Sequence, residues 1–391
     1  MMKVQTYKEL EDLIPKVESD LEVAVKEREK LGLTIPEDYQ VCITFYNSEN
    51  AKATAQGTSS GSIICVNALR TAMEQLDEQD RNKLSGLTYY FDITRTFLRD
   101  ESWIRASIED PVKTLGDFEK AFKSEQIFQI YKEGCKARGR EYDSYKDFTI
   151  KNAEKAKKTL EELMPSIKEG FKKADLSLRH ELDHSAFFTS QIYKDFNSKL
   201  ALTKQLQHKL GIEKDQSVSK ELAKANMEVL KAKVEIEPLL EPRALFFTHV
   251  KPDEWDKADF EKVKNKVYGN FLLSYIERAF PQDILDPLVS QKWSNGEMDT
   301  ATSMFLFYTV NLQRQSANSI AYVIQPEKVN YNIANKVLYQ ELPEWKAKLA
   351  KNARTAVEAI GNAYKEKPSR LKEANNSKTF EEFIEICKGG K

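Results

Sequence analysis

β-Forming sequence is confined to one short stretch of this 391-residue chain. Residues 39–46 and 62–67 are rich in β-branched and aromatic side chains and predict two strands, with a weaker strand over 51–56. Elsewhere the apolar residues recur at helical spacing, and the chain contains only 14 glycines. The sequence therefore predicts an α+β fold that is predominantly α-helical, with one small β-sheet.

Helical segments are predicted on both sides of this stretch. Amphipathic spacing predicts helices over the first 35 residues, over much of 68–163, and over 167–188 and 217–234. After residue 255 the helical pattern resumes, and we expect breaks at prolines, because proline cannot continue a helix without losing a hydrogen bond. These prolines are Pro281, Pro326, Pro343 and Pro368.

Acidic and basic residues almost balance, with 60 Lys and Arg against 61 Asp and Glu, which gives a formal net charge of −1. Neither nucleic acid nor an anionic membrane is therefore an expected partner. No stretch approaches the 18 or so uncharged apolar residues of a membrane-spanning helix. The four cysteines form no CxxC pair, and the amino-terminal segment is charged, so we expect a cytoplasmic protein. The sequence does not indicate an oligomeric state.

The pentapeptide HELDH at residues 180–184 has the spacing of a zinc site. On a helix, His180 and His184 lie about 5.4 Å apart along the axis on one face, so both rings can reach one ion. Glu181 can then reach a water on that ion and act as general base and acid in hydrolysis. Tyr193 and His249 lie close enough in sequence to be considered as donors to a developing oxyanion.

Two of only four histidines in the chain occur in this motif. The simplest other interpretation is a solvated helix face with two incidental histidines. The flanking residues argue against it, since Leu178, Leu182 and Ala186 give the helix an apolar side. A buried active-site helix is expected to have such a side.

With this motif the chain resembles the zincin metallopeptidases. The resemblance implies bound Zn²⁺, a peptide or protein substrate, and a zincin-like catalytic domain over residues 1–250. It also implies that the helices at about 75–165 are an insertion, because more than 110 residues separate the strands from His180. Residues 251–391 would form an α-helical carboxyl-terminal region. Zincins place a small sheet over the active-site helix, and segments 53–57 and 62–67 resemble its edge element.

The third metal ligand distinguishes the zincin branches. Metzincins continue as HExxHxxGxxH, whereas this chain has Phe187 and Ser190 at the last Gly and His positions, which excludes that branch. The thermolysin-like gluzincins take a Glu from a later helix. We favour Glu241, because it begins an apolar run and the helix that carries a ligand must be buried. The alternatives are Glu221, Glu228, Glu237 and Glu277.

Two other functions stay open. HELDH also resembles the HExDH motif of peptide deformylases, whose EGC motif supplies a cysteine ligand, and this chain has Glu133-Gly134-Cys135. The residues that follow Cys135 depart from that family, and its early glycine-rich motif is absent. The other possibility is a non-enzymatic helical interaction protein in which HELDH is incidental.

Overall fold

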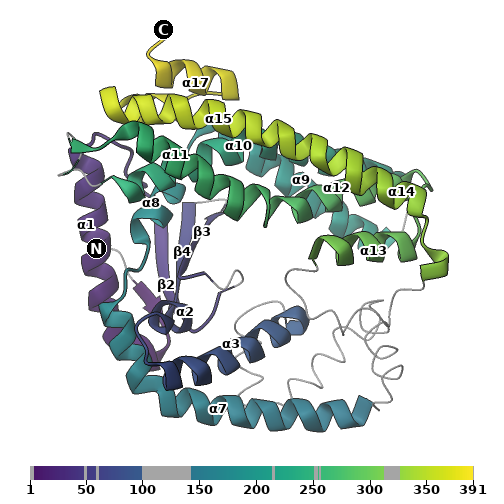
Figure 1. The fold of residues 1–391 in the computed structure, drawn as a ribbon, viewed down its shortest axis with the longest axis horizontal. Helices are drawn as coiled ribbons and strands as arrows, with labels where there is room; N and C mark the ends of the chain where they lie inside the picture. The colour runs from purple at the N-terminus through teal and green to yellow at the C-terminus, as the bar shows by residue number, and fades with distance from the viewer. Residues whose placement is uncertain are drawn as a thin grey trace. The chain divides into compact units, whose positions relative to one another are not determined.

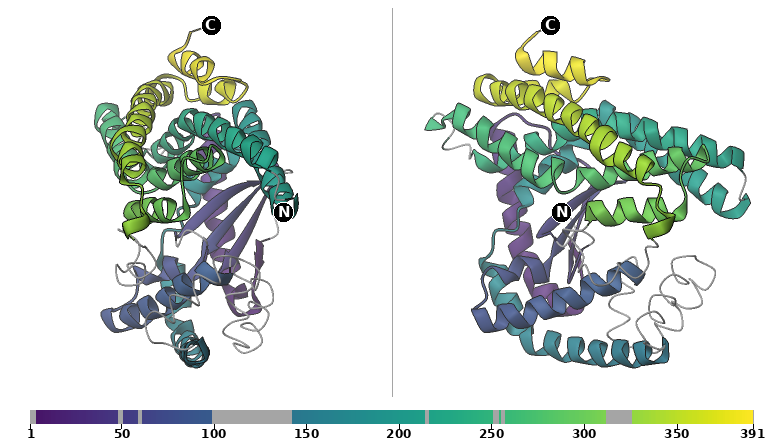
Figure 2. Two further views of the ribbon diagram at one scale, coloured as in Figure 1. Left: turned by 90° about the vertical axis from the view of Figure 1, so that its right-hand side faces the viewer. Right: turned by 45° about the vertical axis from the view of Figure 1, so that its right-hand side comes forward.

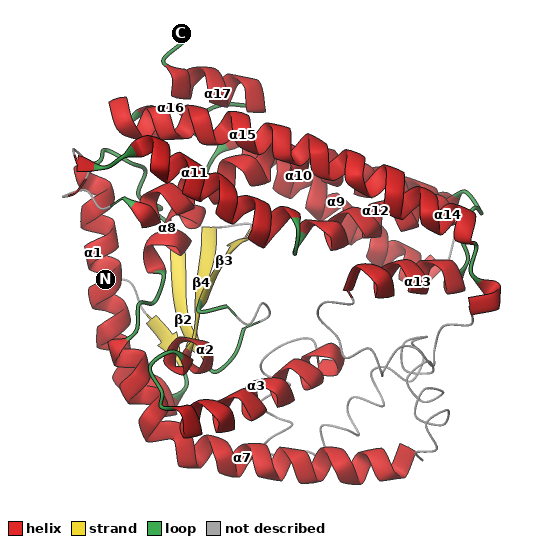
Figure 3. Cartoon of the chain, viewed as in Figure 1, coloured by secondary structure: helices red, strands yellow, loops and turns green. Residues whose placement is uncertain are grey.

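The computed structural model of the protein contains one small sheet among many helices (Figures 1 and 3), which confirms the α+β, predominantly helical fold class. The chain divides into two compact units, Met1–Ala24 with Asp38–Glu181 and Val25–Glu37 with Leu182–Lys391. The functional division at residue 250 stays a prediction. The structure describes residues 4–47, 51–58, 61–98, 142–213, 216–250, 254, 257–311 and 326–390.

The sheet of the first unit has four strands in the order β1-β2-β4-β3. β1 and β2 are parallel to β4, and β3 pairs with β4 in the antiparallel sense, so β3 is an edge strand. In β4, Ile64 and Val66 are fully buried while Ile63 is 37% exposed, as expected for a strand with one face on the core. The strands are β1 (Val4–Thr6), β2 (Tyr39–Thr44), β3 (Ala53–Thr58) and β4 (Gly61–Asn67).

Helices α2, α3 and α7 of this unit pack against one another. Asn67 ends β4 and caps α2, because its side chain accepts a hydrogen bond from the Arg70 N–H at 3.0 Å. α7 buries Leu163, Ile167 and Phe171, which recur at helical spacing. The predicted insertion at about 75–165 lies partly outside the described residues. The helical elements are the 3₁₀ helix η1 (Lys8–Leu13), α1 (Ile14–Lys30), α2 (Ala68–Met73), α3 (Glu78–Leu98) and α7 (Tyr142–Lys173).

The single helix predicted over 167–188 was wrong, because the chain breaks between α7 and α8 (Leu178–Phe187). Ser177 lies directly before α8 and has a φ of 58°, in the left-handed region, which a continuous right-handed helix does not include. The Asp175 side chain accepts a hydrogen bond from the Ser177 N–H at 2.9 Å and so stabilises the turn. The Ser177 carbonyl then accepts the N–H groups of His180 and Glu181, which starts α8 at the motif.

Helix α10 (Gln216–His249) is the central element of the second unit and packs against α9, α11, α12 and α15. α10 and α15 run side by side in every view (Figure 2). The remaining elements are α9 (Gln191–Glu213), α11 (Phe260–Phe271), the π-helical η3 (Leu272–Ile276), α12 (Phe280–Ser294), α13 (Thr300–Asn311), the 3₁₀ helix η4 (Pro326–Lys328), α14 (Tyr331–Lys336), the π-helical η5 (Val337–Glu341), α15 (Leu342–Glu366), α16 (Arg370–Ala374) and α17 (Phe380–Lys388). α1 and α8 each begin in the first unit and end in the second.

The helix predicted to end near residue 234 continues to His249, through Pro238 and Pro242. Both prolines cost hydrogen bonds, but apolar packing around them outweighs this loss. Leu239, Phe246 and Phe247 are fully buried in the core that α10 shares with α15 and α17. In contrast, the breaks predicted at Pro281 and Pro368 are confirmed, since Pro281 lies in the first turn of α12 after a turn at 277–279 and Pro368 follows α15. Pro326 begins η4. The break predicted at Pro343 was wrong, because η5 passes into α15 without a non-helical residue and Pro343 lies within this continuous helix.

Among the described residues, no helix is both long and apolar enough to cross a membrane. The sheet contains a close approach between two backbone segments. Gly61 at the start of β4 has a φ of 154°, and a Cβ there would lie 1.9 Å from the Asp38 carbonyl oxygen. That carbonyl accepts the Ser62 N–H at 2.9 Å, so Gly61 allows the contact between β4 and the segment before β2.

We therefore expect Gly61→Ala to lower the free energy of unfolding by more than about 2 kcal/mol, because it adds backbone strain and a steric clash. Gly86→Ala is the control, since Gly86 is exposed in α3 with no heavy atom within 4 Å of an added Cβ. This control should be neutral or stabilising by up to about 1 kcal/mol. Urea denaturation followed by circular dichroism measures both, and equal effects would contradict the account.

Candidate metal centre

Helix α8 places the two motif histidines on one face. His180 and His184 are one turn apart, while Leu178, Leu182 and Ala186 are buried at 0–3% exposure, as the apolar pattern predicted. His184 is itself 6% exposed and His180 is half-buried. The His184 ring stacks on Phe188 with 6.4 Å between ring centroids, which restricts its orientation.

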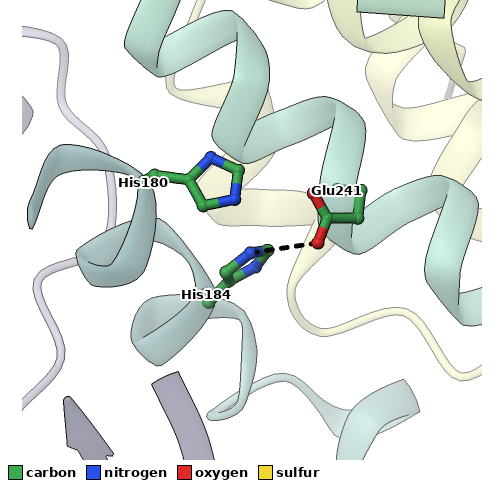
Figure 4. A group of neighbouring side chains, drawn as sticks. All are labelled: His180, His184 and Glu241. Carbon is green, nitrogen blue, oxygen red and sulfur yellow. Dashed lines mark ion pairs between the residues drawn. The ribbon is translucent and has the colours of Figure 1, made fainter. Parts of the chain in front are cut away.

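The Glu241 side chain from α10 meets these rings (Figure 4). Its Oε1 lies 3.4 Å from Nε2 of His184. One ligand atom from each of His180, His184 and Glu241 lies within 4.8 Å of the others. Two ligands at about 2.0–2.1 Å from one tetrahedral zinc ion are about 3.3 Å apart, so the His184–Glu241 separation suits a shared ion. The residues present therefore fit a three-ligand zinc site.

Among the described residues, the carboxylate that groups with both imidazoles is that of Glu241. The other glutamates considered from the sequence lie elsewhere or have other partners. Glu221 is exposed, Glu228 pairs with Lys231 at 2.7 Å, and Glu277 pairs with Lys346. Glu237 lies one turn before Glu241 on the same helix. Glu241 reaches the histidines because α10 continues past residue 234.

The residues considered for catalysis have distinct surroundings. Glu181 is 6% exposed, next to His180 on α8. Tyr193 packs its ring 4.5 Å from that of Phe188. Burial, with the charge of Glu237, raises the pKa of Tyr193 to about 12, so its hydroxyl keeps its proton. His249, at the end of α10, has Nε2 3.3 Å from the Asn270 side-chain amide.

Asp183, the fourth residue of HELDH, is fully buried with two arginines. Its Oδ1 accepts a hydrogen bond from Arg28 Nη1 at 2.6 Å, and its Oδ2 lies 3.6 Å from Arg243 Nε. Burial alone would raise the pKa of Asp183, but the charges of Arg243 and Arg28 hold that pKa below its ordinary value. Asp183 is therefore an anion that contacts the arginines and does not share the histidine face.

An acidic group lies beside the candidate ligands on α10. Glu237 has a side chain that is 13% exposed, and Lys233 lies 4.0 Å from it. Burial raises the pKa of Glu237 to about 7, opposed by Lys233 and increased by the charges of Glu241 and Asp283. Tyr275, which donates a hydrogen bond to Glu237, has its pKa raised well above the ordinary value by burial and these charges.

The sequence predicted His180, Glu181, His184 and Glu241 as site residues, and the structure groups the two histidines with Glu241. The sequence analysis did not single out Arg28 or Arg243. Arg243 had one signal, a charge inside an apolar run, whereas Arg28 lies in a charged segment typical of a surface helix. Cys135 of the deformylase-like motif lies outside the described residues. A scan against models of known protein families found no match, and searches of curated proteins and of solved structures found no significant similarity.

The raised pKa of Glu237 predicts a pH dependence of stability. The folded state keeps the Glu237 proton up to about pH 7, whereas the unfolded chain releases it near the ordinary value of 4.5. The contribution of this group to stability therefore falls as pH rises from 4.5 to about 7. In chelator-treated protein, Glu237→Gln should remove this loss. The free energy of unfolding of the variant, relative to that of wild type, should therefore rise by on the order of 3 kcal/mol between pH 5 and pH 8.

Denaturant titrations at several pH values measure this gain. Glu221→Gln is the matched control, because Glu221 is an exposed carboxylate on the same helix. It should follow the wild-type pH profile. A constant difference between Glu237→Gln and wild type across this range would show that Glu237 has no raised pKa.

Proposed function

We propose that this protein is a zinc-dependent metallopeptidase of the gluzincin type, in which His180, His184 and Glu241 hold the metal. The observation that carries the proposal is that these three side chains present ligand atoms within 4.8 Å of one another. Two imidazoles and one carboxylate are the protein ligands of thermolysin-type zinc sites, which leave one position for water or substrate. The histidine spacing and the position of Glu241 support the same site by different routes.

Zinc held by these three residues would supply a Lewis acid that lowers the pKa of water towards about 7. The chain's own residues would have separate tasks. Glu181 would take a proton from the attacking water and deliver it to the leaving amine. Tyr193, whose hydroxyl keeps its proton throughout the neutral range, and His249 are the two candidates for the donor to the developing oxyanion.

We assign a peptide or protein as the substrate, on the basis of the zincin resemblance. The near-zero net charge gives no support to a nucleic-acid substrate. A cytoplasmic setting is supported by the cysteine content, because four cysteines in 391 residues are too few for a disulfide scaffold. A helical interaction protein with an incidental motif does not account for a carboxylate that meets both histidines. A deformylase-like site would use Cys135 where we assign Glu241.

Metal analysis tests the ligand assignment. We expect one zinc per chain in protein purified without chelator, and loss of at least ten-fold in zinc affinity in His184→Ala and in Glu241→Ala, because each removes a ligand. His208→Ala is the matched control, since His208 is exposed on α9 and should leave zinc content unchanged. Wild-type protein that takes up no zinc would contradict the proposal.

Hydrolysis tests the role of Glu181 separately. In Glu181→Gln we expect zinc to be retained and peptide hydrolysis to fall by about 10²–10⁴-fold, the range typical for loss of a general base. A peptide library read by mass spectrometry supplies the substrate for this assay. Wild-type protein that holds zinc at full occupancy but cleaves nothing in the library would restrict the proposal to metal binding. Full activity in Glu181→Gln would remove this residue from the mechanism.

A further inference from the structure

Three buried charges are close in sequence or in space to the proposed zinc ligands. Asp183 directly precedes His184, and Arg243 follows Glu241 by two positions on α10. The third charge, Arg28, comes from the end of α1. Their side chains are at most 1% exposed. Charges of this kind are costly to bury unless each has a partner.

These charges connect three helices through paired contacts. Asp183 of α8 lies between the two guanidinium groups, at 2.6 Å from Arg28 Nη1 and 3.6 Å from Arg243 Nε. Arg28 Cζ lies 5.1 Å from the ring centroid of Phe247 on α10. Arg243 Cζ lies 5.2 Å from the ring centroid of Phe187 on α8. Each arginine therefore contacts both Asp183 and an aromatic ring. Phe247 lies one helical turn after Arg243, and Phe187 lies one helical turn after Asp183.

Polar groups on other segments complete the cluster. Arg28 Nε donates to the Thr34 carbonyl at 2.8 Å, and Arg243 Nη1 donates to Asn375 Oδ1 at 2.7 Å. The Asn375 amide in turn donates to Thr34 Oγ1 at 3.0 Å. The cluster thus has directional contacts with segments more than 100 residues apart in the chain.

Directional contacts of this kind fix how a helix is rotated about its axis. A slip of one residue turns a helix by about 100°, which would carry Asp183 away from both arginines and leave buried charges without partners. Apolar packing alone is non-directional and tolerates such a slip more readily. The same rotations decide whether His184 of α8 and Glu241 of α10 face each other.

We propose that Asp183, through Arg28 and Arg243, is a positioning residue that sets the rotation of α8 and α10 and so holds His180, His184 and Glu241 in zinc-binding geometry. This inference rests on the proposed function. It assigns a task to the variable fourth position of HELDH, which has no contact with the metal in the proposed site. Stability alone would not require the cluster to be adjacent to the ligands on both helices.

Asp183→Asn tests the proposal, because it removes the charge and keeps the shape of the side chain. Zinc affinity is measured by competition with a chelator, and the ligand geometry by the visible absorption of Co²⁺-loaded protein. Both are measured at a temperature at which circular dichroism shows the variant to be folded. We expect zinc affinity to fall about 10–100-fold, with an altered Co²⁺ spectrum.

Glu341→Gln is the control for loss of a partly buried, paired carboxylate, since the Glu341 side chain is 19% exposed. Glu341 of η5 accepts a hydrogen bond from the buried Lys292 of α12 at 2.9 Å. Both helices belong to the second unit. It should lower stability and leave zinc affinity and the Co²⁺ spectrum unchanged. If Asp183→Asn, like this control, changes stability but neither zinc affinity nor the Co²⁺ spectrum, the positioning role is overturned.

Arg243→Lys is the second variant, for the case in which Asp183→Asn does not fold. It keeps the positive charge but loses the fork geometry and the ring contact, so we expect a smaller loss of zinc affinity in the same direction. Wild-type affinity and spectrum in whichever of these variants folds would overturn the positioning role. Wild-type protein that binds neither Zn²⁺ nor Co²⁺ would instead overturn the proposed function, and this inference with it.

Discussion

The hydrogen bond of 2.6 Å between Arg28 and Asp183 joins residues 155 positions apart, and neither side chain has any exposed surface. Such a pair does not add stability simply by existing, because both ions lose their hydration when they are buried. Its physical effect is to exclude other arrangements, since any alternative packing of these helices would leave a charge without a partner. Arg243 extends this restriction to α10, and Asn375 extends it to the segment between α16 and α17.

Continuity of α10 is the second constraint on the proposed site. Glu241 follows Pro238 and precedes Pro242, a composition that normally ends a helix. The helix persists because Leu239, Phe246 and Phe247 are buried against other helices of the unit. Glu241 is 29% exposed within this apolar surrounding, which leaves one carboxylate with access to both the histidines and solvent. The core of the second unit and the chemistry of the site thus depend on the same helix.

Local sequence predicted much of this fold, because the relevant forces act within a few residues. Spacing and side-chain type predict the strands near residues 39–46 and 62–67, the helix start at Pro281, and the shared face of His180 and His184. The break at Ser177 was missed because Ser177 adopts a left-handed conformation, and the sequence has no Gly or Pro at this position to indicate a break. The buried arginines were missed because the local sequence of Arg28 looks like that of a surface helix. The sequence does not distinguish Arg28 from its charged neighbours, and only its contact with Asp183, 155 positions later in the chain, shows that Arg28 is buried.

X-ray absorption spectroscopy of the zinc-loaded protein tests the central claim most directly, because it identifies the atoms bound to the metal. The account predicts two imidazole nitrogens at about 2.0–2.1 Å and carboxylate or water oxygens at about 2.0–2.2 Å, with no sulfur. Substitution of Glu241 by Gln should weaken the oxygen contribution and keep both imidazoles. A sulfur atom at about 2.3 Å would contradict the account and would indicate a cysteine ligand in place of Glu241.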